Sequence, residues 1–326
     1  MLVLALNNCK FEYQKALMRG PLFYSKILLF GEYGIIKDSK GLSIPYNFYN
    51  GALKRTDVKT SFAKDSNSKL FKFYDYLKNL NSPIVNFNLD KFYNDLKLGM
   101  YFDSSIPEGY GVGSSGALVA AVYDYYANDK ITVLENLTRE KLLKLKEVFS
   151  TMESFFHGKS SGLDPLNSYL SIPILINSKK DIKVTGIPSQ ERVGEGAVFL
   201  LDSGEVSTTA PMINIFMESM KKDGFRKMLN DKFIKYTNMC VEDFLNGDLS
   251  SLFQNTKKLS KVVFENFKPM IPNKYHSLWQ KGIANDSYFL KLCGSGGGGY
   301  ILGFAKDFEK AKKELAGHKI EVVYNF

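Results

Sequence analysis

The sequence is poor in cysteine, histidine and tryptophan. Its 326 residues include three Cys, three His and one Trp. Cys9, Cys240 and Cys293 stand far apart and form no CxxC pair, which excludes a disulfide framework and leaves a zinc site short of ligands. Sparse, unpaired cysteines are typical of a reducing compartment, so we expect a cytoplasmic protein.

Long hydrophobic runs and dense basic clusters are also missing. No apolar stretch reaches the length of a membrane span, and the N-terminal MLVLALNN is too short for a signal peptide and lacks its basic lead. We interpret residues 1–17 as an extension ahead of a start at Met18. The net charge of +9 comes from lysines spread along the chain. Such a charge suits a solvated surface or a bound polyphosphate, and we expect neither nucleic acid nor a membrane as a partner.

The apolar pattern predicts strands and helices without regular βαβ alternation, which indicates an α+β fold. Residues 25–36 are expected to form a strand, a turn and a second strand. Thr138 and Gly158 are the expected caps of an amphipathic helix. Other strands are expected at 50–62, 171–177, 197–204, on both sides of the glycines at 294–299, and at 319–326. Other helices are expected at 70–80, 116–128, 307–316 and throughout 210–283.

The stretch PEGYGVGSSGALVAAVYDYY, residues 107–126, runs from a glycine-rich turn into an apolar helix pattern. Gly111–Gly116 fits GxGxxG, but the opening βαβ unit of a dinucleotide site is missing. GxxxxGK[ST], HRD and DFG are absent as well, which excludes a Walker loop and a protein kinase. Backbone N–H groups at a helix start favour an anion such as phosphate. A tight turn capping a buried helix is the alternative for this stretch taken alone.

A second glycine run makes the ligand interpretation stronger. Residues 294–299 contain five Gly in six positions, between two strand patterns. A hairpin needs one or two glycines, not five. So many in succession favour backbone held against a ligand or against another loop.

Three motifs, in this order, resemble the GHMP kinase superfamily, which includes galactokinase, homoserine kinase, mevalonate kinase and phosphomevalonate kinase. They are KILLFGEYG at 26–34, PEGYGVGSSGA at 107–117 and KLCGSGGGG at 291–299. ESFFHGKSSGLDP at 153–165 and DSGEVSTT at 202–209 are similar to segments of mevalonate kinases, and Asp164 argues against the homoserine kinase branch. The chain departs from the family at Tyr33, Gly116 and Cys293, where His, Ala and Thr are usual.

The resemblance implies a two-domain α+β fold of the GHMP kinase type. A ribosomal-S5-like N-terminal domain would cover residues 1–190, and a ferredoxin-like C-terminal domain residues 191–326. ATP would lie between them, and the protein would be a monomer or a homodimer. The implied reaction transfers the γ-phosphate of ATP to a small-molecule alcohol, mevalonate. Another GHMP enzyme (phosphomevalonate kinase, diphosphomevalonate decarboxylase or a sugar kinase) and a non-catalytic nucleotide-binding member remain alternatives.

The resemblance also implies roles for individual residues. Asp164 would accept the proton of the alcohol, and Lys26 would keep Asp164 ionised and offset charge on the reacting oxygens. Ser115 and Glu153 would bind Mg²⁺. The residues expected to hold ATP are Gly109, Gly111, Gly113, Ser114, Ser115 and Gly116, together with Gly294, Gly296 and Gly297.

Taken singly, several of these residues have simpler explanations. Lys26 fits an exposed strand residue, and Glu153 a carboxylate on a helix surface. Asp164 before Pro165 fits a helix N-cap followed by an N1 proline. His157, one helical turn after Glu153, is interpreted as a structural or substrate-side group rather than a base.

Overall fold

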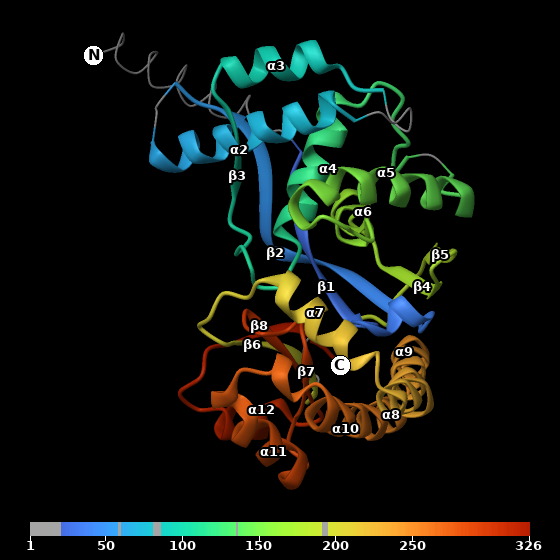
Figure 1. Cartoon of the computed structure of the whole chain (residues 1–326). Helices are drawn as coiled ribbons and strands as arrows, with labels where there is room; N and C mark the ends of the chain where they lie inside the picture. The colour runs from blue at the N-terminus through green and yellow to red at the C-terminus, as the bar shows by residue number, and fades with distance from the viewer. Residues whose placement is uncertain (1–20, 58–59, 81–85, 135, 191–194) are drawn as a thin grey trace.

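The structure, a computed structural model, describes residues 21–57, 60–80, 86–134, 136–190 and 195–326. Figure 1 shows two bodies, one above the other, each built on its own sheet. The expected extension at 1–17 and Cys9 lie outside the described residues. The domain boundary between residues 190 and 191 stays a prediction, and it falls in the connection between the last strand of the upper sheet and the first strand of the lower one.

The upper sheet is antiparallel, and its longest strand organises it. β2 (Gly41–Arg55) pairs with β1 (Phe23–Phe30) along its length, with β4 (Ile174–Ser178) near its start and with β3 (Met100–Ser104) near its end. β5 (Asp181–Val184) pairs with β4 at the edge. In this register Lys26 of β1 lies opposite Pro45, at the centre of the β1–β2 pair.

Helices pack on this sheet according to their apolar faces. α4 (Ser114–Tyr126) is apolar on nearly every side and lies buried against β1 and the short α6 (Leu163–Leu170). α5 (Arg139–His157) has the predicted caps, since the Thr138 hydroxyl accepts a hydrogen bond from the Lys141 N–H and Gly158 ends the helix. α2 (Ser61–Lys78) and α3 (Leu89–Lys97) pack together over β3.

The lower body contains a four-stranded antiparallel sheet in the order β7-β8-β6-β9. Its strands are β6 (Ala197–Asp202), β7 (Phe289–Leu292), β8 (Tyr300–Ala305) and β9 (Ile320–Asn325). The predicted helix-rich region and the strands around the glycine run are confirmed. The helices are α7 (Thr209–Ser219), α8 (Asp223–Met228), a π-helix (Leu229–Ile234), α9 (Lys235–Asn246), α10 (Leu249–Asn266), α11 (His276–Asn285) and α12 (Phe308–Glu314).

Together the two sheets and their helices confirm the α+β class. In the described part of the chain, no helix combines the length and the hydropathy that crossing a bilayer requires.

Three local predictions were wrong. Residues 34–36 form part of a 3₁₀ turn (Gly34–Lys37) rather than a strand, because Tyr33 and Asp38 adopt positive φ and turn the chain on both sides. The strand predicted at 50–62 ends at Arg55, and α2 begins at Ser61. Asp164 does not cap α6: the N-cap is Gly162, and Asp164 lies inside the first turn.

Candidate active site

The first glycine loop ends at the start of α4, where backbone N–H groups are free. Gly113 is the N-cap of α4 in the left-handed conformation. The N–H groups of residues 109–116 donate to no other part of the described chain. Orphan N–H groups together with the positive end of the helix dipole make a site for an anion. That these small residues hold the phosphates of ATP stays a prediction, and their free N–H groups are what it requires.

Lys26 and Asp164 form an ion pair beside this loop. The Lys26 Nζ lies 2.9 Å from the Asp164 Oδ1, and the backbone N–H of Lys26 donates to the carbonyl of Val112 at 3.0 Å. β1 thus fixes Lys26 against the loop, while α6 brings Asp164 to it. Burial lowers the pKa of Lys26, but the neighbouring Asp164 carboxylate, together with Cys293 and Glu32, outweighs it, so the pKa of Lys26 is raised. The interpretation of Lys26 as an exposed strand residue is wrong, since it is buried.

Gly116 allows the close approach of α4 and α6. A β-carbon on Gly116 would stand 2.8 Å from the carbonyl carbon of Asp164 and 3.0 Å from its Cβ. Such distances leave no room for a side chain. The departure from the alanine that the resemblance leads one to expect is therefore matched by the local packing.

Ser115, Glu153 and His157 gather at the start of α4. The Ser115 hydroxyl donates to the Glu153 Oε1 at 3.0 Å and lies 3.0 Å from the His157 Nε2. Glu153 is buried, which excludes its interpretation as a surface carboxylate. Burial, and then the nearby Asp164, raise the pKa of Glu153 to about 7. Burial lowers the pKa of His157, although Asp164 opposes that shift.

This donor set fits Mg²⁺ that is shared with a polyphosphate. Among the described residues, no three His, Cys, Asp or Glu side chains come together as a metal cage. Mg²⁺ commonly takes one or two protein oxygens and completes its shell with water and phosphate oxygens. The Ser115 hydroxyl and the buried Glu153 carboxylate supply oxygens of this kind, and a cation would offset the cost of keeping Glu153 charged.

The third motif packs directly on the first glycine loop. Gly111 has φ of +80°, and a β-carbon on it would stand 2.6 Å from the carbonyl oxygen of Cys293. The N–H of Tyr300, at the far end of the motif, donates to the carbonyl of Tyr110 at 3.3 Å. The structure therefore brings residues 294–299 against residues 109–111, so the glycine run is held against another loop, one of the two arrangements that the sequence favoured.

The sequence analysis did not identify three residues that contribute to this region. Lys291 and Glu32 form a buried ion pair with 2.6 Å between Nζ and Oε1. Ser160 donates a hydrogen bond to Glu153. A charged residue within each of the apolar stretches LLFGEYG and YFLKLCG was the available signal for the ion pair, because charges seldom stand in buried strands unpaired.

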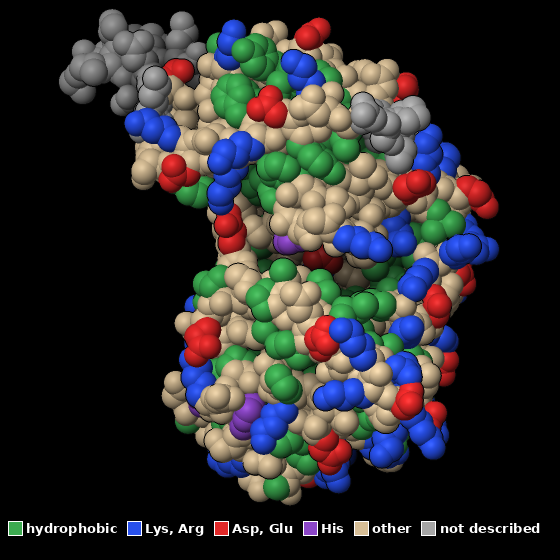
Figure 2. All heavy atoms as spheres, in the orientation of Figure 1, with side chains coloured by type: hydrophobic (Ala, Val, Ile, Leu, Met, Phe, Trp, Pro, Cys, Tyr) green, Lys and Arg blue, Asp and Glu red, His purple; other side chains and the backbone are tan. Residues whose placement is uncertain are grey.

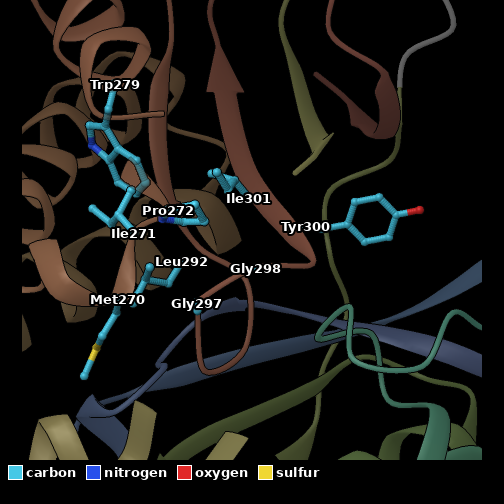
Figure 3. A pocket seen from close by; sticks show the side chains of 10 residues that line it. Met270, Ile271, Pro272, Trp279, Leu292, Gly297, Gly298, Tyr300 and Ile301 are labelled. Atoms are coloured by element: carbon cyan, nitrogen blue, oxygen red, sulfur yellow. The ribbon is translucent and has the colours of Figure 1, made fainter. Parts of the chain in front are cut away.

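Two views show where the molecule is hollowed. Figure 2 shows a deep notch between the two bodies, with histidine and acidic side chains on its floor. Figure 3 shows a recess on the lower body behind the third motif, which encloses about 180 Å³ including its open mouth. The recess leaves no internal room even for a water molecule, so we interpret it as packing space behind the loop. Its walls include Met270, Ile271, Trp279, Leu292, Gly297 and Ile301.

Comparison with known proteins finds one family that part of the chain resembles. Residues 75–171, which include the first glycine loop, Glu153 and Asp164, match the family described as GHMP kinases N terminal domain. This match covers less than half of the chain, so it shows that residues 75–171 are similar to that domain family. No curated protein matches the sequence significantly.

Solved GHMP kinase structures share the whole fold. The L. major mevalonate kinase in complex with R-mevalonate is 18% identical with a TM-score of 0.61, and the match covers 94% of this chain and 97% of that one. The Methanococcus jannaschii mevalonate kinase is 18% identical with a TM-score of 0.57, covering 95% and 98%. The Streptococcus pneumoniae phosphomevalonate kinase in complex with phosphomevalonate and AMPPNP is 13% identical with a TM-score of 0.59, covering 94% and 100%. At these identities the likeness is one of fold.

Proposed function

We propose that this protein belongs to the GHMP superfamily and is an ATP-dependent kinase that phosphorylates the primary alcohol of mevalonate, in isoprenoid biosynthesis. The observation that carries the proposal is the Lys26–Asp164 ion pair beside a glycine loop with free N–H groups. Phosphoryl transfer depends mainly on positioning and on neutralising charge. The loop supplies the first requirement and the ion pair contributes to the second.

The residues divide the work as follows. The N–H groups of residues 109–116 hold the phosphate chain of ATP. Asp164 orients the acceptor hydroxyl and takes its proton at a carboxylate oxygen. Lys26 pairs with that carboxylate and offsets charge on the oxygens that gain it. Ser115 and Glu153 would hold Mg²⁺, which when bound screens the phosphate charge.

The acceptor is the part of the proposal with the least support. Mevalonate is favoured because the segments 153–165 and 202–209 resemble mevalonate kinases, and because the L. major and M. jannaschii enzymes share the fold. A phosphomevalonate kinase also shares it. Phosphomevalonate, diphosphomevalonate and a sugar are therefore the alternative acceptors, and a non-catalytic nucleotide-binding protein is the alternative from another class.

An ADP-release assay with Mg·ATP tests the proposal. The acceptor panel contains mevalonate, phosphomevalonate, diphosphomevalonate, homoserine and galactose. We expect turnover on mevalonate alone. Turnover on a different acceptor would refute the acceptor while keeping the kinase. ATP binding without turnover on any acceptor would favour the non-catalytic alternative.

Two further proposals accompany this function. Both cysteines within the described residues are free thiols, and with the pathway proposed they favour a cytoplasmic protein. A monomer or a homodimer is proposed, without nucleic acid or a membrane as partner. Sedimentation at several protein concentrations distinguishes the two assembly states.

A further inference from the structure

Two consecutive residues of the upper body reach across to the third glycine motif. Glu32 and Tyr33 lie in the turn after β1. The Glu32 Oε1 accepts a hydrogen bond from the Lys291 Nζ at 2.6 Å, and the Tyr33 hydroxyl donates to the carbonyl of Ser295 at 2.7 Å. The turn therefore contacts the motif both at its first residue and inside its glycine run.

Both contacts are costly to build. The side chains of Lys291 and Glu32 are 4% and 6% exposed, so two charges have been taken out of water. Tyr33 has φ of 58°, which a bulky residue seldom adopts. Its ring is held by Phe216 of α7, with ring centroids 4.7 Å apart. Among the contacts of the described residues, neither Glu32 nor Tyr33 forms a hydrogen bond or ion pair with Lys26 or Asp164, although the charge of Glu32 contributes to the raised pKa of Lys26. The catalytic proposal does not by itself require the contacts to the third motif.

The third motif needs an external restraint. All five of its glycines have positive φ, and such a backbone loses much conformational freedom when it is ordered. Bonds from within the lower body shape the loop, since Gly297 donates to the carbonyl of Met270 at 2.6 Å and Gly299 to that of Glu205 at 2.6 Å. They fix its form. Its distance from the first glycine loop depends on contacts with the upper body, namely the 3.3 Å bond from the Tyr300 N–H to the Tyr110 carbonyl and those made by Glu32 and Tyr33.

We propose that Glu32 and Tyr33 are positioning residues that clamp the third motif onto the first glycine loop. With the clamp closed, Cys293 and Gly294 lie against Gly111, and the N–H groups of the first loop are held ready for a polyphosphate. The clamp concerns how well the third motif and the first glycine loop are ordered. Its effect on nucleotide affinity rests on the proposed function.

Tyr33→Phe is the principal test, because it removes one hydroxyl and keeps the ring. Tyr324→Phe is the matched control, since the Tyr324 hydroxyl donates to the carbonyl of Pro188 at 2.6 Å from a buried ring. In the lower sheet Tyr324 pairs with Val198, near one end of β6, whereas Tyr300 pairs with Asp202 at the other end. The control therefore lies away from the third motif. Amide hydrogen exchange is measured across 291–300 and 107–113, and the Kd of a non-hydrolysable ATP analogue by calorimetry.

We expect Tyr33→Phe to speed amide exchange in both segments and to raise the Kd of the ATP analogue by about 2- to 10-fold. A change of this size corresponds to the loss of one hydrogen bond. Tyr324→Phe should change neither. Unchanged exchange in Tyr33→Phe, or faster exchange with unchanged affinity, would overturn the proposal. If the wild-type protein binds no analogue, the proposed function fails, and the clamp is then judged on exchange alone.

The ion pair gives a second, independent test. Glu32→Gln, Lys291→Gln and the double variant form a double-mutant cycle, read as exchange rates in 291–300. We expect each single variant to speed exchange and the double variant to speed it less than the product of the two. If the effects of the two single variants on the exchange rates simply multiply in the double variant, the ion pair does not act as a unit. That result would overturn the role of Glu32 in the clamp.

Discussion

The Lys26 ammonium and the Asp164 carboxylate, 2.9 Å apart, differ sharply in exposure: the Lys26 side chain is 4% exposed and that of Asp164 38%. The lysine is held inside the protein by β1, while the Asp164 carboxylate is partly exposed to solvent. An acceptor alcohol can therefore reach Asp164 without displacing Lys26. The same asymmetry predicts that the two residues serve the chemical step more than nucleotide binding.

Asp164→Asn and Lys26→Met should each lower turnover by about 10²–10⁴-fold, the usual contribution of a positioned proton acceptor. The Kd of the ATP analogue should stay within a few-fold of wild type. Lys54 and Asp103 provide the control, since they form a half-exposed ion pair at 2.5 Å on β2 and β3. Lys54→Met and Asp103→Asn should keep full turnover. Near-normal turnover in either site variant would remove the proton-transfer role.

Glu153→Gln should raise the Mg²⁺ concentration required for half-maximal turnover. A charge-assisted contact is worth about 1.5–3 kcal/mol, so we expect a shift of about 10- to 100-fold. Mn²⁺ binding in the presence of the ATP analogue, followed by electron paramagnetic resonance, gives a readout that does not depend on turnover. Glu147→Gln, an exposed position on the same helix, should change neither. Wild-type metal dependence in Glu153→Gln would exclude this carboxylate from the metal site.

Gly116→Ala should disturb the site although it adds only one methyl group. The β-carbon would overlap Asp164 and force α6 away from α4, at a cost of about 1–3 kcal/mol of stability for an overpacked contact. Turnover should fall further than stability alone explains, because Asp164 moves. In Gly224→Ala, at an open position in α8, we expect a gain of up to about 1 kcal/mol. Thermal unfolding and kcat, measured on both variants, separate the effect on stability from the effect on turnover. A Gly116→Ala variant that is both active and as stable as wild type would contradict the close contact of α4 and α6.

Local patterns predicted much of the fold. α5 followed from apolar spacing and from its caps at Thr138 and Gly158, and α4 from a run of small apolar residues after a glycine loop. These signals act over one or two turns of chain, so the sequence carries them directly. The glycine loops were also visible as loops, because runs of glycine suit neither a helix nor a strand interior.

Long-range contacts were not predictable in the same way. Lys291 and Glu32 are 259 residues apart in sequence, and no local pattern pairs them. The strand predicted at 34–36 failed because its apolar residues, Ile35 and Ile36, follow a tyrosine with positive φ, a conformation that tertiary packing imposes. Only the resemblance joined Lys26, Glu153 and Asp164, and their roles stay predictions for the variants above.

The buried thiols give a prediction that does not depend on the proposed reaction. Burial raises the pKa of Cys293 to about 11 and that of Cys240 to about 12, so very little thiolate exists at pH 8. In a Cys9→Ser variant, which removes the third thiol, a thiol reagent should react slowly with the folded protein and rapidly in denaturant. A raised pKa in the folded state also means that the free energy of unfolding falls as the pH rises from about 9 toward 11. Rapid modification of the folded variant at pH 8 would contradict the burial of both thiols.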